Sequence, residues 1–252
     1  MNVNSNIFID KKILIYGLGK SGISTFKFLK KKNKISLFDD NKNIESFKKI
    51  KKSKFDVIIL SPGININKCK LKNFLKKNFK IIYTDLDVFK SFYNNKCITI
   101  TGTNGKSTTS KLLYEVLKKQ GYDVKIGGNI GYPILSIKNI KPKSIFVIEA
   151  SSYQLDYSQI FKSKYAFILN ISPDHIERHK TIEKYLKAKF KLIKNQKKGH
   201  LAFVKKNDEL IQKEISSNKF KGRIIGVNTN KHSSFYKNVK NKYFFTETNH
   251  EN

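Results

Sequence analysis

Short apolar runs alternate along the chain with longer lysine-rich stretches that carry apolar residues at helical spacing. This alternation is typical of βα units, so it predicts parallel sheets with helices packed on them. The predicted strands cover residues 12–16, 35–38, 56–60, 80–83, 97–101, 124–126, 144–148, 166–170, 200–204 and 223–227. Helices are predicted from the end of the segment 17–22 to about residue 32 and over about 85–92, 107–120 and 181–194, with Gly121 ending the third one.

The pattern restarts near residue 94, where a new strand follows the end of a helix. We therefore expect two α/β domains, over residues 1–93 and 94–252, each built on a parallel sheet. The apolar signal weakens from residue 228 onward, where only a strand at 242–246 is predicted and no closing helix is visible.

The charge of the chain is strongly positive, with 51 Lys and Arg against 19 Asp and Glu, or +32. Nearly all of this charge is lysine, because the arginines are only Arg178 and Arg223. Nucleic-acid sites favour arginine, and these lysines are spread over the whole chain. We therefore interpret the charge as a compositional bias that attracts anionic ligands, and a nucleic-acid binder stays an alternative that rests on charge alone.

The apolar runs are far shorter than the roughly 20 residues of a membrane span. The first residues lack the apolar core of a secretion signal, and the two cysteines, Cys69 and Cys97, form no disulfide framework. We expect a cytoplasmic, monomeric protein that binds neither membranes nor nucleic acid.

The strongest motif joins the strand at 97–101 to the following helix and reads Gly102-Thr103-Asn104-Gly105-Lys106-Ser107-Thr108. Glycines let backbone N–H groups approach phosphates, a helix N-terminus attracts anions, and a Lys-Ser pair suits phosphate and Mg²⁺. Ile100 stands where the general phosphate-loop pattern has its first glycine. We expect an ATP-binding loop at residues 102–108 in a P-loop-type domain.

A second glycine motif, Gly17-x-Gly19-x-x-Gly22, follows the first strand and is typical of Rossmann-like domains. Asp39 or Asp40, at the end of the second strand, is placed to hold a ribose. From these residues alone the ligand is NAD or another nucleotide diphosphate. Ser61-Pro62-Gly63 ends the third strand, where a plain turn and a ligand loop are equally good interpretations.

Three further candidates lie beyond predicted strands or in a helix. Glu149 ends a strand beside the predicted phosphate loop, where a carboxylate suits Mg²⁺, although the segment is also compatible with a helix cap. His175 could act as a metal ligand or as a general acid or base, and the alternative is a histidine with a structural role only. Lys189 is one lysine among many in its helix.

Taken together, the segments Gly102–Thr108, Gly127-Gly128-Asn129-Ile130-Gly131, Glu149-x-Ser-Ser-Tyr-Gln-Leu and Asn170-x-x-Pro-Asp-His closely resemble the Mur ligases. The leading Gly-Leu-Gly-Lys-Ser-Gly and Ser-Pro-Gly-Ile motifs narrow the resemblance to the members that act on UDP-N-acetylmuramoyl-L-alanine. It covers residues 12 to about 227. It implies a cytoplasmic ligase of peptidoglycan precursor synthesis that uses ATP and Mg²⁺.

The resemblance implies that ATP phosphorylates the carboxylate of UDP-N-acetylmuramoyl-L-alanine and that D-glutamate then attacks the acyl phosphate. The resemblance also implies that the catalytic residues are Lys106, His175 and Lys189. Ser107 and Glu149 bind one Mg²⁺, and His175 binds a second with Lys189, which becomes carbamylated. The substrate-binding residues implied by the family are Lys20, Ser21, Asp40, Asn41, Ser61, Gly63, Asn129 and Ser151. The first glycine motif then serves a UDP-sugar instead of NAD.

The chain also departs from the family pattern. Mur ligases carry a third, C-terminal domain, which we do not expect within these 252 residues, and we expect the last elements of the central domain to be absent from them as well. The alternative is therefore a fragment that binds ATP or the UDP-sugar without ligating. Folylpolyglutamate synthases share the ATP loop, but residues 12–92 argue against that group because it lacks a leading Rossmann unit.

Overall fold

The computed structural model describes residues 6–42 and 44–228, so the strand predicted at 242–246 lies outside the described residues. The chain forms two compact units. The first unit comprises Met1–Asn94 together with two later segments, Pro133–Lys138 and Tyr157–Phe161, and the second unit comprises the remaining residues.

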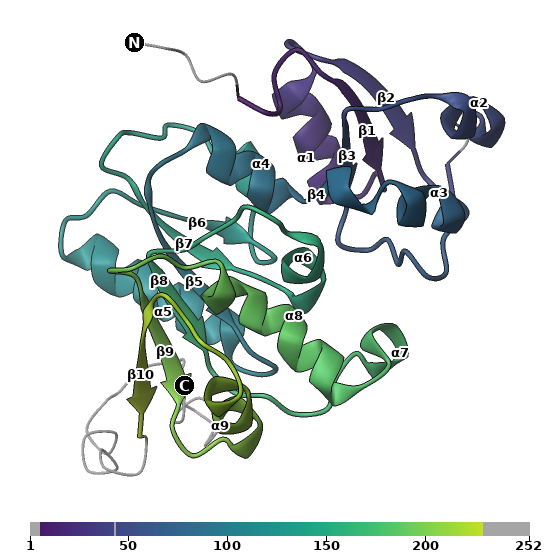
Figure 1. The fold of residues 1–252 in the computed structure, drawn as a ribbon. Coiled ribbons are helices and arrows are strands. Elements are labelled where there is room, and N and C mark those ends of the chain that lie inside the picture. The colour runs from purple at the N-terminus through teal and green to yellow at the C-terminus, as the bar shows by residue number, and fades with distance from the viewer. Residues whose placement is uncertain (1–5, 43, 229–252) are drawn as a thin grey trace. The chain divides into compact units, whose positions relative to one another are not determined.

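The first unit is built on a four-stranded parallel sheet in the order β2-β1-β3-β4 (Figure 1). Its strands are β1 (Lys12–Tyr16), β2 (Lys34–Phe38), β3 (Val57–Leu60) and β4 (Ile82–Tyr83). The strand predicted at 80–83 is shorter than expected. A 3₁₀ turn, η1 (Phe79–Ile81), takes its first part, because the Ile81 N–H donates to the Asn78 carbonyl and closes a turn.

The helices of the first unit are α1 (Lys20–Leu29), α2 (Phe47–Lys52), α3 (Lys72–Lys77) and α4 (Asp85–Phe92), and η2 (Ile134–Ser136) packs beside α1 and α4. The apolar side chains of β1 and β3 continue into those of α2 and α3 as one cluster. Its members include Leu14, Tyr16, Ile50, Ile58, Leu60, Leu71 and Leu75. The alternate positions of the strands thus hold α2 and α3 on the sheet.

Asp87 in α4 ties the segment Tyr157–Phe161 into the first unit. One of its carboxylate oxygens accepts hydrogen bonds from the Ser158 hydroxyl (2.8 Å) and from the backbone N–H groups of residues 159, 160 and 161 (3.0, 2.8 and 2.9 Å). The other accepts from the N–H of Thr84 in a capping box. Burial raises the pKa of Asp87, and these hydrogen bonds oppose the rise.

The second unit is built on a six-stranded parallel sheet in the order β10-β9-β8-β5-β7-β6 (Figure 1). The strands are β5 (Lys96–Thr101), β6 (Val124–Gly128), β7 (Ile145–Glu149), β8 (Tyr165–Ile168), β9 (Leu201–Lys205) and β10 (Arg223–Val227). β5 lies between β8 and β7, so the loop after it opens at the carboxyl edge of three neighbouring strands.

The helices of the second unit are α5 (Lys106–Lys119), α6 (Ser152–Tyr157), α7 (Ile176–His179), α8 (Ile182–Lys194) and α9 (Glu209–Ser216). α5 packs Leu113 and Leu117 on Ile100 and Val147. It ends as predicted at Gly121, whose N–H donates to Lys118 while the next N–H donates to Leu117. In the part of the chain that the structure describes, no helix is long and apolar enough to cross a membrane.

Candidate active site

The loop predicted to bind phosphate joins β5 to α5 and needs glycine at two positions. Gly102 has φ +151°, and a Cβ there would lie 3.1 Å from the Leu169 Cβ on the neighbouring strand end. Gly105 has φ +78° and stands at the N-cap of α5. A side chain at either position is therefore strained, and the small residues keep the backbone N–H groups of the loop accessible.

The loop is fixed to the segment that follows β8. The N–H of Thr103 donates to the Asn170 carbonyl (3.0 Å), and the N–H of Asn104 donates to the Asn170 side-chain oxygen (2.9 Å). The Thr103 hydroxyl accepts from the N–H of Ser172 (3.0 Å) and lies 3.2 Å from the Tyr185 hydroxyl. Sequence reasoning quoted Asn170 in a motif without giving it a role, and it missed the role of Tyr185.

Glu149, the last residue of β7, is itself buried and lies at the centre of a polar cluster whose other members, Ser107 and Asn129, are exposed. The Ser107 hydroxyl donates to one of its carboxylate oxygens (2.7 Å), and the Asn129 amide donates to the other (2.8 Å). The Asn129 N–H also donates to the Glu149 backbone carbonyl (2.8 Å). The structure thus brings together three residues that sequence analysis took from three separate motifs.

Gly128 makes this close approach possible. It has φ +105°, and a Cβ there would lie 2.3 Å from the Glu149 carbonyl oxygen. Ser151, on the other side of Glu149, makes its hydrogen bonds to the Gln154 side chain at the start of α6. Asn129 therefore bonds the Glu149 carboxylate directly, whereas Ser151 bonds Gln154.

Lys106 opens α5 and donates a 2.6 Å hydrogen bond to the Thr103 carbonyl inside the loop. Burial lowers the pKa of Lys106, while the negative charges of Glu149 and Asp174 oppose this. The ammonium group therefore lies among the loop, Glu149 and the segment before His175, where a bound phosphate would neutralise it.

Lys189 in α8 is almost completely buried, although the sequence places it in a lysine-rich helix. Its amine donates to the Gly102 carbonyl (2.7 Å) and to the Thr101 hydroxyl (3.4 Å), and it lies 4.5 Å from the centre of the Tyr185 ring. Burial and the charge of Lys106 lower the pKa of Lys189 to about 7. Burial also raises the pKa of Tyr185 to about 12.

His175 has φ 53° and precedes α7. Its ring is 45% exposed, lies 3.4 Å from Asp174 and 3.8 Å from Glu177, and packs against Tyr153 at 4.8 Å between ring centres. The neighbouring His179 is buried, bonds the Ser152 hydroxyl at 3.0 Å and has its pKa lowered by burial. Sequence analysis gave His179 no role.

The donor atoms fit one Mg²⁺ ion better than two. The Ser107 hydroxyl and the Glu149 carboxylate are adjacent oxygen donors, the type that Mg²⁺ prefers. His175 offers nitrogen beside Asp174, and Lys189 as an unmodified amine offers no oxygen and donates to a carbonyl. Among residues 6–42 and 44–228 no group of three or more His, Cys, Asp and Glu side chains is arranged as a metal site.

The residues predicted to hold the UDP end gather in the first unit. The Ser61 hydroxyl donates to the Gly17 carbonyl (2.6 Å), and a Cβ on Gly22 would lie 1.9 Å from that oxygen. The strand-end loops after β1 and β3 are therefore locked together. Lys20 and Ser21 begin α1, and Gly63 is exposed with open space around it.

The two aspartates after β2 have different partners. Asp39 accepts from the N–H of Leu18 (2.6 Å), inside the glycine motif, and from the N–H of Asn41 (3.0 Å). Asp40 accepts from the Tyr16 hydroxyl (2.6 Å) and from the N–H of Lys70 (3.3 Å). Each carboxylate oxygen of both aspartates thus accepts one hydrogen bond, but Asp39 is bonded to the glycine loop, whereas Asp40 is bonded to Tyr16 and Lys70.

The fold and this site define a class of protein. The Mur ligase middle domain matches residues 100–251, which is more than half of the chain, so the chain belongs to the Mur ligase family. A solved UDP-N-acetylmuramate:L-alanyl-gamma-D-glutamyl-meso-diaminopimelate ligase from Neisseria meningitides has the same fold, with a TM-score of 0.55 at 16% identity over 86% of this chain and 78% of that one. A murein peptide ligase from Psychrobacter arcticus gives 0.51 at 12% identity, over 86% of this chain and 53% of that one.

Within the family, the similar curated relatives carry the name UDP-N-acetylmuramoylalanine--D-glutamate ligase. The one from Rickettsia bellii is 39% identical over 77% of this chain and 46% of its own length. The one from Caldicellulosiruptor bescii is 38% identical over 73% of this chain and 45% of its own length. The one from Aquifex aeolicus is 34% identical over 91% and 55%. The chain thus spans about half the length of these relatives.

Proposed function

We propose that this chain forms the ATP- and UDP-substrate-binding part of a ligase that adds D-glutamate to UDP-N-acetylmuramoyl-L-alanine. The observation that carries the proposal is the single cluster formed by Lys106, Ser107 and Glu149 at the carboxyl edge of the second sheet. The names of the relatives support the choice of substrates.

The proposed reaction has two steps. The terminal phosphoryl group of ATP passes to the alanyl carboxylate, which gives an acyl phosphate and ADP. The amine of D-glutamate then attacks the acyl carbon, the C–O bond to phosphate breaks, and the amine loses a proton as the amide forms. Two anionic reactants meet in the first step, so the site must offset their charge.

The phosphate loop supplies most of this offset. The backbone N–H groups of residues 102–108 and the N-terminus of α5 bind phosphate oxygens. Lys106 exchanges its bond to the Thr103 carbonyl for an oxygen of the transferring phosphate. Ser107 and Glu149 would hold one Mg²⁺, and such an ion would neutralise phosphate charge.

For Lys189 we propose carbamylation, with the product joining His175 around a second Mg²⁺. Its depressed pKa, with burial as the main cause, supports this, because a neutral amine is the form that attacks CO₂. The modification would replace a buried amine by an anionic oxygen ligand. As an amine, Lys189 instead holds the Gly102 carbonyl and so steadies the start of the loop.

The remaining predicted residues complete the proposal. Asn129 and Ser151, on either side of Glu149, contact the muramoyl-alanine part. Residues at the strand-end loops of the first unit hold the UDP end, namely Lys20, Ser21, Asp40, Asn41, Ser61 and Gly63. We propose that the protein acts as a monomer in the cytoplasm, since the reaction consumes ATP.

Calorimetric titration of the 252-residue chain with UDP-N-acetylmuramoyl-L-alanine and, separately, with ATP and Mg²⁺ tests the proposal. Saturable binding of both is expected, and D-glutamate-dependent ADP release is expected from a chain of the relatives' full length. Binding without ADP release by the longer chain would favour the alternative of a binding protein that does not ligate. A folded chain that binds neither compound would contradict both.

A further inference from the structure

A pocket of about 330 Å³ in the first unit lies between α2 and α3. It is lined by Phe47, Lys51, Cys69, Lys70, Leu71, Lys72, Asn73 and Phe74. None of these residues is among those predicted to bind the UDP end. The volume is that of a small-molecule site at the lower end of the usual range.

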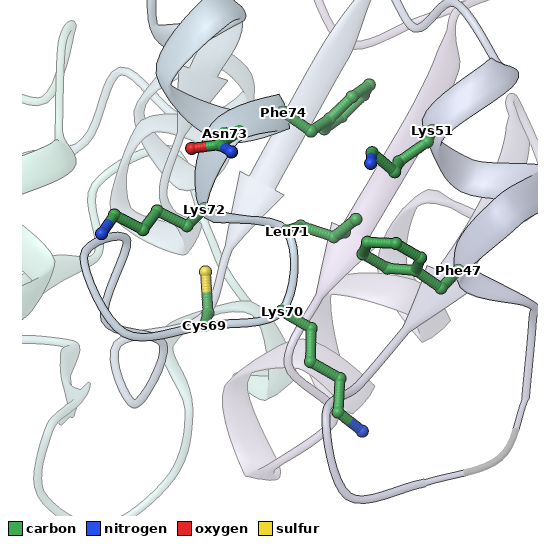
Figure 2. A pocket seen from close by; sticks show the side chains of 8 residues that line it. All are labelled: Phe47, Lys51, Cys69, Lys70, Leu71, Lys72, Asn73 and Phe74. Carbon is green, nitrogen blue, oxygen red and sulfur yellow. The ribbon is translucent and has the colours of Figure 1, made fainter.

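The lining is mixed, and its apolar part consists of Phe47, Cys69, Leu71 and Phe74. Leu71 is 1% exposed and belongs to the core cluster of the sheet, and Phe74 packs against that cluster. Phe74 also meets Phe55 edge to face, with 6.2 Å between ring centres. In Figure 2 the Phe47 ring and the Leu71 side chain point toward one another across the space. Such walls favour a planar, apolar ring.

The charged groups of the pocket are all positive. Lys51 holds its ammonium group 4.9 Å from the centre of the Phe47 ring, and Figure 2 shows it turned toward the space beside Leu71. Lys70 is committed to Asp40, because its ammonium group donates to the Asp40 carbonyl (2.5 Å). Lys72 points away in the same view. Lys51 is therefore the cation that faces an occupant, and no lining residue is acidic.

We propose that this pocket binds a small aromatic anion, a single ring that carries a phosphate or carboxylate group. The ring lies against Phe47, Leu71 and Phe74, and the anionic group pairs with the Lys51 ammonium. Phe47 orients that ammonium through a cation–π contact. The inference does not rest on the proposed ligase function, because the pocket includes neither the phosphate loop after β5 nor the glycine loop after β1.

Phenyl phosphate is a suitable probe for the intact 252-residue chain, with phenol and inorganic phosphate as its two halves. Calorimetry is expected to show one site with a millimolar dissociation constant for phenyl phosphate and weaker binding of each half. Lys51→Met, which keeps the stem, is expected to weaken binding about three- to fivefold, and Phe47→Ala by at least as much.

Two exposed residues outside the pocket give matched controls, Lys52→Met in the same helix and Phe79→Ala in η1. Both variants are expected to bind phenyl phosphate like the unchanged chain, and circular dichroism checks the fold of all four. If Phe47→Ala does not fold, Phe47→Leu replaces it, since it keeps an apolar side chain but loses the ring.

Three results would overturn the proposal. If inorganic phosphate bound as tightly as phenyl phosphate, the general positive charge of the chain would be sufficient to explain the binding, without the pocket. If Lys52→Met lost as much affinity for phenyl phosphate as Lys51→Met does, the conclusion would be the same. Displacement of phenyl phosphate by saturating UDP would assign the pocket to the nucleotide site, whereas unchanged binding in the presence of UDP supports a separate pocket.

Discussion

The buried amine of Lys189 donates a 2.7 Å hydrogen bond to the carbonyl of Gly102, the first residue of the phosphate loop. A long side chain from α8 thus reaches the end of the central strand β5 and meets a carbonyl, a hydroxyl and an aromatic ring there. No carboxylate is hydrogen-bonded to this amine in the part of the chain that the structure describes, although Asp174 and Glu149 act on it from a distance.

We expect Lys189 to take up CO₂ with a pH dependence centred near its pKa of about 7. The neutral amine predominates above that pH, so carbamate formation rises as the pH is raised through 7. Carbon-13 NMR with labelled bicarbonate measures it. Lys189→Ala loses the signal, and Lys187→Ala, at an exposed position of the same helix, keeps it. A signal that survives in Lys189→Ala would contradict the assignment.

The same residue makes stability depend on pH. Its folded pKa of about 7 lies below the ordinary value of 10.5, so between these values the unfolded chain binds one proton more. The free energy of unfolding therefore rises with pH over this window, by up to about 1.4 kcal/mol per unit from this group. Urea titrations in CO₂-free buffer at pH 7 and 9.5 are expected to show a smaller rise for Lys189→Met. Equal rises would show that the buried amine stays charged.

Lys106→Ala is expected to abolish ATP-dependent ADP release in a chain of full length, because the phosphate loop loses its ammonium group. The stability cost is expected to be below about 1 kcal/mol, since the lost hydrogen bond goes to a loop carbonyl. Lys111→Ala, exposed on the same helix, is the control. Unchanged turnover in Lys106→Ala would remove Lys106 from the reaction.

Gly128→Ala is expected to destabilise the second unit by about 2–4 kcal/mol. The new Cβ meets the Glu149 carbonyl oxygen at 2.3 Å, and the φ of +105° adds strain. Gly131→Ala isolates the strain, because Gly131 also has positive φ but open space around its Cβ position, so about 1 kcal/mol is expected there. Thermal unfolding measures both. Equal losses would mean that the contact with Glu149 relaxes freely.

Asp87→Ala is expected to cost about 3–5 kcal/mol, because it leaves the donors of residues 158–161 buried without an acceptor. Hydrogen exchange measures it locally: the amides of residues 159–161 should exchange much faster, while those of α5 should change little. Asp87→Asn keeps an acceptor oxygen, so its exchange rates for these amides should lie between those of the unchanged chain and those of Asp87→Ala. Unchanged protection of 159–161 in Asp87→Ala would contradict the anchoring role.

The alternation of apolar runs and helices was sufficient to predict the two parallel sheets and most of their strands, because buried parallel strands are short, continuous apolar runs. The short helices α2, α3, α6, α7 and α9 were missed, since four to eight residues give too little periodicity. The closeness of Glu149, at the end of β7, to the loop that follows β5 was predictable because parallel strands end at one edge of the sheet.

Other parts of the site depend on contacts between distant residues and leave no local pattern. Nothing in the lysine-rich sequence around Lys189 distinguishes the buried amine from its exposed neighbours. The different pairing of Asp39 and Asp40 depends on the positions of Leu18, Tyr16 and Lys70, and so required the folded chain.

The segment Tyr157–Phe161 gives the first unit a particular order of assembly during synthesis. The Asp87 carboxylate is made early, but the donors that surround it are in residues made some seventy positions later. A nascent chain that has emerged only as far as residue 94 therefore has every strand of the first sheet and still lacks the partners of this buried acid. The first unit can therefore reach its final structure only after the phosphate loop, β6 and β7 of the second unit have been synthesised.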